Sequence, residues 1–156
     1  MTRLLALVAG LLACAQTLAA EQDWSQVFKE GLVDADGKPV AVSTLKNKVV
    51  AVYFSAHWCP PCRQFTPKLV EFAKKHSAKL AVVFVSSDNS QAEMTGYMKE
   101  AGMPWPSTPY RSASGGALGN KHGVRGIPTL LVFGKDGQLI TKNGRNLAEL
   151  EKILAK

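Results

Sequence analysis

The sequence predicts an α/β domain in which helices flank a central sheet. Apolar segments rich in β-branched residues alternate with segments whose apolar residues recur at helical spacing, which is typical of this class. The chain of 156 residues is long enough for one domain with its own core. It contains no internal repeat and no linker of the kind that separates domains. These observations together predict a single α/β domain.

The first half of the chain is predicted to form a hairpin followed by strand, helix and strand. Asp36-Gly37 is a hairpin-type turn signal. Residues 49–55 are apolar on both faces, which is typical of a central strand. Residues 62–76 carry apolar side chains at helical spacing and polar ones largely on the other faces. The predicted elements are a hairpin over 31–34 and 40–42, a strand over 49–55, a helix over 62–76 and a buried strand over 80–86.

The second half is predicted to contain two capped helices, a loop and a second hairpin. Ser90 and Glu93 have capping-box spacing, which predicts a helix running to about residue 101. Residues 103–116 are rich in Pro, Ser and Gly and are predicted to form a loop. The remaining predictions are a short helix over 117–122, an antiparallel hairpin over 129–133 and 139–141, and a final helix capped by Asn146 and Glu149 that ends near residue 156.

The motif Cys59-Pro60-Pro61-Cys62 lies between the predicted central strand and the following helix. Two cysteines at this spacing close into a small disulfide ring and reopen, so the pair carries two electrons. At a helix N-terminus, the dipole and the free N–H groups favour the thiolate of the first cysteine. We therefore expect Cys59 to be exposed and to attack a disulfide, and Cys62 to be shielded and to resolve the mixed disulfide.

The two prolines predict how strongly the Cys59 thiolate is stabilised. Proline is tolerated in the first turn of a helix, where its missing N–H has no intrahelical partner. Pro61, however, has no N–H to donate to a side chain at the N-cap. The thiolate then depends on the Cys62 N–H, the helix dipole and the Cys62 thiol. We expect a moderately lowered pKa for Cys59 and a reducing couple, nearer to about −270 mV than to the about −120 mV of a strong oxidant.

Two neighbours of Cys59 have open interpretations. Trp58 offers an apolar platform for a partner, or packs against the start of the helix, and both can hold. His57 is placed to tune the thiolate or to carry a proton, and the alternative is a solvent-facing histidine with no role.

The first 20 residues predict a secretory signal peptide. Arg3 gives a short positive start, and residues 4–13 are an unbroken run of apolar and small residues, too short to span a bilayer as a mature helix. Residues 17–19 resemble a signal-peptidase site. We expect a mature domain over 21–156, exported to a bacterial periplasm. In the alternative, residues 11–14 act as a lipobox and Cys14 becomes a lipidated N-terminus.

The charge of the chain limits the kinds of partner that it is expected to bind. The formal net charge is +7, and removal of the leader leaves +6 because Arg3 is its only charged residue. The cationic residues are scattered and do not interleave with aromatic residues, so no nucleic acid is expected as a partner. A solvated surface explains these charges; the alternative is a preference for acidic partners or anionic membranes. No feature indicates an oligomer interface, which predicts a monomer.

Cys59 and Cys62 are the only cysteines of the predicted mature chain, which favours a catalytic pair over a structural disulfide framework. A structural zinc site is the alternative, but no second Cys-x-x-Cys pair supplies further ligands. The methionines Met94, Met98 and Met103 are predicted to pack in helices and loops.

The block from residue 52 to residue 63, VYFSAHWCPPCR, resembles thioredoxin-fold proteins, and most of all the tryparedoxin and nucleoredoxin branch. The resemblance continues through 65–69 and 123–130 and spans the chain from about residue 32 onward. It implies a thioredoxin fold, a central mixed β-sheet flanked by helices with an N-terminal β-hairpin. It implies no cofactor beyond the redox-active Cys59–Cys62 disulfide. Exported bacterial reductases that support cytochrome c assembly are similar in the Trp-Cys-x-Pro-Cys block and the hairpin.

The resemblance also implies roles for residues near the cysteines. Cys59 attacks, Cys62 resolves, and Pro128 is cis and faces the disulfide. The backbone at Ile127, just before Pro128, pairs with an extended substrate segment by strand addition. Two departures are relevant. Tyr53 stands where thioredoxin has a buried acid, so proton transfer to Cys62 requires water, the Tyr53 hydroxyl or another group. Tryparedoxins act inside cells, so their electron donor does not carry over to an exported chain.

These observations predict an exported thiol–disulfide oxidoreductase that reduces disulfides in partner proteins and is recharged by a membrane thiol-electron donor. One alternative is an oxidase or isomerase that runs the same chemistry in reverse. Another is a protein that handles Cu(I) through Cys59, Cys62 and His57. A binding module with a regulatory dithiol, and a dithiol that recharges a peroxidase, are further interpretations.

Overall fold

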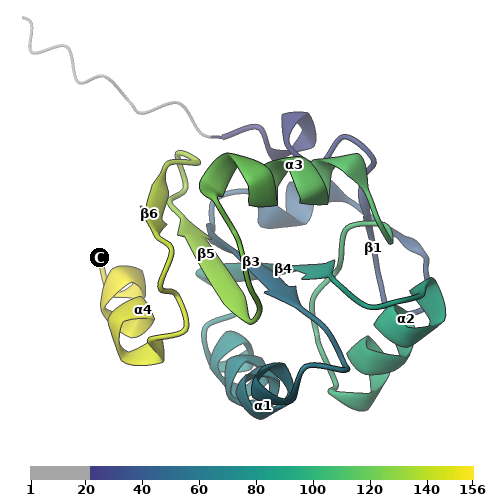
Figure 1. Ribbon diagram of the computed structural model, residues 1–156. Coiled ribbons are helices and arrows are strands. Elements are labelled where there is room, and N and C mark those ends of the chain that lie inside the picture. The colour runs from purple at the N-terminus through teal and green to yellow at the C-terminus, as the bar shows by residue number, and fades with distance from the viewer. Residues whose placement is uncertain (1–21) are drawn as a thin grey trace, which may run out of the picture.

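The computed structural model describes residues 22–156 as a four-stranded mixed sheet with helices on both faces (Figure 1). The predicted leader over 1–20, with Cys14, lies outside the described residues. None of the helices within 22–156 is long and apolar enough to cross a membrane. The elements are η1 (Trp24–Gln26), β1 (Leu32–Val33), β2 (Pro39–Val40), η2 (Val42–Leu45), β3 (Val49–Ser55), α1 (Pro60–Lys75), β4 (Leu80–Ser86), α2 (Gln91–Glu100), α3 (Ala113–His122), β5 (Thr129–Phe133), β6 (Leu139–Thr141) and α4 (Leu147–Leu154).

The sheet has the strand order β4-β3-β5-β6. β3 runs parallel to β4 over its whole length, from the pair Val49–Leu80 to the pair Ser55–Ser86. β3 runs antiparallel to β5, and β5 runs antiparallel to β6. The predicted central strand over 49–55 therefore lies between two partners, and the mixed sheet is confirmed. Since β3 ends directly before the cysteine motif, the centre of the sheet positions the dithiol.

Both faces of the sheet are buried, which explains why β3 is apolar throughout. Successive strand residues point to opposite faces, so one strand supplies two separate cores. Helices α1, α2 and α4 cover one face, while α3, η1 and η2 cover the other (Figure 1). The β3 residues of the first core are Val49, Ala51 and Tyr53, and those of the second are Val50, Val52 and Phe54.

The predicted N-terminal hairpin forms β1 and β2, which pair antiparallel. Gly37 in the intervening turn has φ +77°, a left-handed conformation that glycine adopts without steric cost. Ser107 joins this hairpin to the edge of the sheet, because it bridges both Val33 and Phe84. The predicted second strand was too long: β2 ends at Val40, and Val42 begins the 3-10 helix η2.

The capping signals place the starts of α2 and α4. The Ser90 hydroxyl accepts a hydrogen bond from the Glu93 backbone N–H at 3.1 Å, as expected of an N-cap. The Glu93 carboxylate bonds to the Asn89 N–H instead of the Ser90 N–H, so the reciprocal half of the capping box is displaced by one residue. The Asn146 side chain caps α4 by accepting from the Glu149 N–H.

The predicted loop over 103–116 extends too far, and the predicted helix over 117–122 starts too late, because α3 begins at Ala113. The Ser112 hydroxyl caps this helix by accepting from the Gly115 N–H. Gly115 is disfavoured in a helix by propensity, but packing requires it. A Cβ at this position would stand 3.0 Å from Val85 Cγ1. Close approach of α3 to the sheet therefore overrides the local preference for a loop.

Candidate active site

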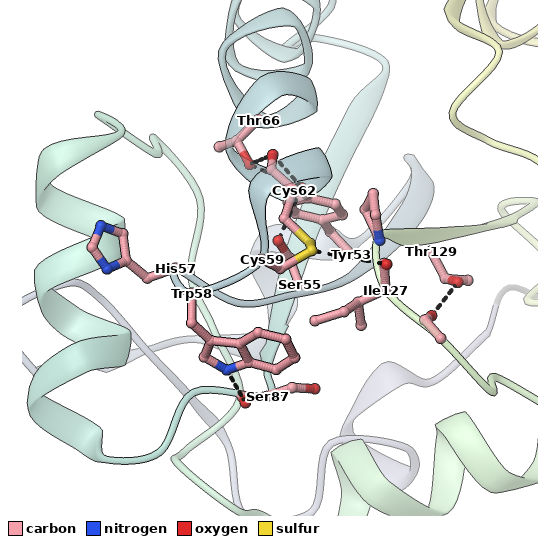
Figure 2. Close-up of a disulfide and its surroundings, with 12 residues drawn as sticks. Tyr53, Ser55, His57, Trp58, Cys59, Cys62, Thr66, Ser87, Ile127 and Thr129 are labelled. Carbon is pink, nitrogen blue, oxygen red and sulfur yellow. Dashed lines mark hydrogen bonds between the residues drawn. A yellow bond between two sulfur atoms is a disulfide. The ribbon is translucent and has the colours of Figure 1, made fainter.

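Cys59 and Cys62 occupy the N-terminus of α1, directly after the loop that follows β3. Cys59 is the N-cap, and Pro60 and Pro61 are the first two helical residues, as predicted. The two cysteines form a disulfide with their Cα atoms 5.2 Å apart (Figure 2). Cys59 is 4% exposed and Cys62 is fully buried. Cys59 is therefore the more accessible sulfur, as predicted, but it is much less exposed than the sequence indicated.

The segment before β5 closes over the Cys59 sulfur. The Ile127–Pro128 peptide bond is cis, as the resemblance implied. The Ile127 carbonyl oxygen lies 3.9 Å from Cys59 Sγ (Figure 2). The Thr129 hydroxyl donates a 2.7 Å hydrogen bond to the Gly126 carbonyl and thereby closes this turn. Because β3 and β5 are neighbours in the sheet, two segments far apart in the sequence meet at one disulfide.

Trp58 directly precedes Cys59 in the loop after β3. Its side chain is 55% exposed, one of two large hydrophobic side chains exposed within residues 22–156. The indole Nε1–H donates a 3.0 Å hydrogen bond to the Ser87 carbonyl, which holds the ring in place (Figure 2). Trp58 is therefore anchored to the segment after β4 and presents an exposed indole, while its role as a platform for a partner stays a prediction.

Asp88 was not predicted as part of the site. It follows β4, is 5% exposed, and its carboxylate accepts a 2.7 Å hydrogen bond from the His57 backbone N–H. The Ser86 hydroxyl donates to the same carboxylate at 2.7 Å. Asp88 thus holds the loop that carries Trp58 and leads to Cys59. The available signal was its position after the strand parallel to β3, where the carboxyl ends of both strands meet.

The His57 imidazole points away from the sulfur atoms (Figure 2). Its Nε2 lies 3.1 Å from a Glu100 carboxylate oxygen on α2, and its ring centroid lies 5.4 Å from that of Tyr97. The predicted role in tuning the thiolate would require a different position. The copper interpretation requires His57 beside both cysteines, and the structure does not bring these three side chains together. Within the described chain, His, Cys, Asp and Glu side chains form no group that could hold a metal ion.

The three methionines predicted to pack in helices and loops lie in the core. Met94 and Met98 of α2 are each 1% exposed, and Met103 is 8% exposed. The prediction that they pack in helices and loops is confirmed.

A network of buried hydroxyl groups lies next to the backbone of Cys62. Tyr53 is fully buried, and its hydroxyl accepts a 3.0 Å hydrogen bond from Ser55. It also shares a 2.8 Å hydrogen bond with Thr66 on α1. The Thr66 hydroxyl lies 2.5 Å from the Tyr97 hydroxyl and 2.9 Å from the Cys62 carbonyl oxygen. This network connects β3, α1 and α2 next to the backbone carbonyl of Cys62.

Burial raises the pKa of Tyr53 to about 12 because a phenolate is poorly solvated in the core. Tyr53 therefore stays protonated at neutral pH and does not act as a base toward Cys62. The Tyr53 hydroxyl is thus unsuited as a proton acceptor for Cys62, which leaves water or another group.

Comparisons with known proteins agree with this geometry. The thioredoxin-like family matches residues 47–139, which include both cysteines and the cis proline. The chain belongs to this family. Probable nucleoredoxin 1 of Arabidopsis thaliana is 43% identical over 115 residues, covering 72% of this chain but only 20% of the relative. The chain thus spans only a fifth of that relative, and 38% of probable nucleoredoxin 2 of Oryza sativa.

Solved structures of the family match over most of their length. Thioredoxin from Wuchereria bancrofti superimposes with a TM-score of 0.68 and 46% identity, covering 80% of this chain and 93% of that one. Tryparedoxin I from Crithidia fasciculata gives a TM-score of 0.70 and 38% identity, covering 83% and 90%. The resemblance to the tryparedoxin and nucleoredoxin branch is confirmed, and the Cys59–Cys62 disulfide lies within the region that matches this thioredoxin-like oxidoreductase family.

Proposed function

We propose that this protein is an exported thiol–disulfide oxidoreductase that reduces disulfides in partner proteins. The observation that carries the proposal is the position of the Cys59–Cys62 pair at the start of α1, with the Ile127 carbonyl 3.9 Å from Cys59 Sγ. A substrate that reaches the sulfur there also meets the backbone before Pro128. The redox group and a recognition backbone are therefore adjacent.

The reaction proceeds by two exchanges. The Cys59 thiolate attacks one sulfur of the partner disulfide, so that a bond forms between Cys59 and the partner while the partner's own S–S bond breaks. The departing thiolate takes a proton from water. The Cys62 thiol then gives its proton to water, and its thiolate attacks Cys59 Sγ. The Cys59–Cys62 bond forms, the mixed disulfide breaks, and the second partner sulfur leaves as a thiolate that takes a proton from water. The Cys59–Cys62 pair has given two electrons to the partner disulfide, and the protons on the two partner thiols come from water.

Recognition of an extended substrate segment is supported by the backbone at Ile127. Strand addition requires backbone groups that the fold leaves unpaired. The Ile127 N–H has no hydrogen-bond partner within residues 22–156, because β5 begins only at Thr129. Trp58, held by Ser87, supplies an apolar surface beside this backbone. We infer that Ile127, Pro128 and Trp58 bind the substrate around its disulfide.

The proposed location follows from the apolar leader over residues 4–13 and the cleavage-like residues 17–19. Export to a bacterial periplasm separates the protein from cytoplasmic reductants. A membrane thiol-electron donor then returns two electrons to the Cys59–Cys62 disulfide after each cycle.

Trapping of the mixed disulfide tests this function. The Cys62→Ser variant retains the attacking sulfur and lacks the resolving one, so we expect it to accumulate partner proteins in adducts that dithiothreitol releases. The Cys59→Ser variant is the matched control, since it keeps one buried sulfur and loses the accessible one. Equal trapping by both variants, or trapping by neither, would contradict the proposed roles.

A further inference from the structure

A cavity of about 540 Å³ lies next to residues that flank Cys59, although neither cysteine lines it. Trp58 and Ile127, which flank Cys59, form part of its wall. The opposite wall is α3, where Gly116 has no atom within 4 Å of the place a Cβ would occupy. The volume lies within the range of about 300–1,000 Å³ that is common for ligand pockets. A substrate segment bound along Ile127 is therefore adjacent to an open cavity.

The lining of this cavity carries positive charge and no acidic side chain. Arg111 and Arg125 both line it, although they are 14 residues apart in the sequence. Neither forms an ion pair or a side-chain hydrogen bond within residues 22–156, and both are exposed. The sequence indicated scattered charges on a solvated surface, but the fold brings these two together at one site.

Arg111 has an unusual backbone conformation. Arg111 has φ +56°, the left-handed region that a residue with a long side chain adopts only at a cost of about 1–2 kcal/mol. Its guanidinium lies 5.2 Å from the centre of the Tyr110 ring. The Tyr110 hydroxyl donates to the Asp88 carbonyl, which connects this turn to the loop that supports Trp58. An asparagine or glycine would adopt this backbone more easily than arginine.

The carboxylates near this cavity are engaged elsewhere. Asp88 accepts hydrogen bonds from the His57 N–H and the Ser86 hydroxyl. Glu30 accepts one from the Ser114 N–H at the start of α3. The two arginines are therefore available to an acidic group from outside the chain, which a guanidinium binds through two parallel N–H···O bonds.

We propose that this cavity is a subsite for an acidic side chain in the substrate segment that flanks the disulfide. The inference rests on the proposed reduction of protein disulfides and names a property of the substrate. A peptide is favoured over a small anion because the cavity is continuous with the backbone at Ile127, along which an extended segment would run. Two partly exposed charge pairs contribute a preference of about tenfold at low ionic strength, which falls as salt is added.

The test compares two peptide disulfides reduced by the pre-reduced protein in a single turnover, so that no electron donor is needed. In one peptide dimer the cysteine is flanked by glutamates, and in the other by glutamines. The readout is the ratio of the two second-order rate constants, taken within each variant so that a general loss of activity cancels. The variants are Arg111→Gln/Arg125→Gln and, as a matched control with the same charge change on α1 and α4, Lys68→Gln/Lys152→Gln.

We expect a ratio of about ten for the wild type and for the lysine control, and a ratio near one for the arginine variant. A wild-type ratio near one, or an unchanged ratio in the arginine variant, overturns the subsite while the proposed function stands. If only glutathione disulfide depends on the two arginines, the site binds a small anion and the peptide assignment is wrong.

A binding measurement separates this inference from the proposed function. If neither peptide dimer is reduced, the proposed function fails, and binding then decides the subsite. The oxidised protein is titrated into labelled peptides in which serine replaces cysteine, and fluorescence anisotropy is followed. The subsite is supported if the wild type binds the glutamine peptide about tenfold more weakly than the glutamate peptide, and if this difference disappears in Arg111→Gln/Arg125→Gln. Equal binding of the two peptides overturns it.

Discussion

Replacement of Thr66 by valine is expected to destabilise the protein although it hardly changes the side-chain volume. Thr66 is fully buried, and its hydroxyl is the centre of the network next to the backbone of Cys62. It contacts the Tyr53 hydroxyl, the Tyr97 hydroxyl and the Cys62 carbonyl at 2.8, 2.5 and 2.9 Å. The variant Thr66→Val removes all three contacts.

The expected loss follows from the partners that remain. Tyr53 keeps its 3.0 Å bond from Ser55, so it loses one ordinary hydrogen bond, worth about 1 kcal/mol. Tyr97 is 3% exposed, and without Thr66 its hydroxyl keeps only its interaction with the Tyr53 hydroxyl, so it is left poorly satisfied at a cost of about 1–3 kcal/mol. We expect Thr66→Val to lower the free energy of unfolding by about 2–4 kcal/mol.

Urea denaturation of a double-mutant cycle measures this effect. Tyr97→Phe removes the group that Thr66→Val leaves unsatisfied, so the double variant should lose less stability than the sum of the two single variants. We expect a coupling energy of about 1–2 kcal/mol. A loss below about 0.5 kcal/mol for Thr66→Val, or strict additivity in the cycle, would refute the reasoning.

Three further predictions concern pH, packing and substrate binding. Burial and nearby lysines lower the pKa of His122, so the unfolded chain binds more protons than the folded one, and the free energy of unfolding should fall as the pH drops through about 6.5. The urea midpoint should therefore be lower at pH 5.5 than at pH 7.5. The variant His122→Gln should show a smaller difference between the two midpoints. Gly144→Ala should lower the free energy of unfolding by about 1–3 kcal/mol, because its Cβ would stand 2.8 Å from the Leu130 carbonyl oxygen. Gly96→Ala, in open space on α2, is the matched control and should gain up to about 1 kcal/mol in the same urea assay. Trp58→Ala should slow reduction of a protein disulfide about tenfold in single-turnover kinetics, with little change in the urea midpoint, because the side chain is 55% exposed.

The strands and capped helices could be predicted because local signals and tertiary packing agree there. The apolar run over 49–55 is buried on both faces, and Ser90 and Asn146 cap α2 and α4. The start of α3 could not be predicted in the same way. Gly115 and Gly116 indicate a loop locally, and only the approach of α3 to Val85 explains a glycine at that position.

The redox centre could be predicted because its residues are contiguous in the sequence. The spacing of Cys59 and Cys62 and the two prolines placed the dithiol at a helix N-terminus. Asp88 could not be found this way, because its contact with the His57 N–H depends on the pairing of β3 with β4. The grouping of Arg111 with Arg125 likewise depends on how α3 and the segment before β5 pack, which no local pattern describes.

The equilibrium reduction potential of the Cys59–Cys62 pair tests the central claim most directly. The protein is equilibrated with a series of dithiothreitol or glutathione buffers, and the fraction of free thiol is measured by alkylation. Absence of a cationic side chain between the cysteines, together with Pro61 at the second helical position, predicts a potential near about −270 mV. A value near about −120 mV, which corresponds to a difference of about 7 kcal/mol, would make the protein a disulfide donor and would contradict its assignment as a reductant.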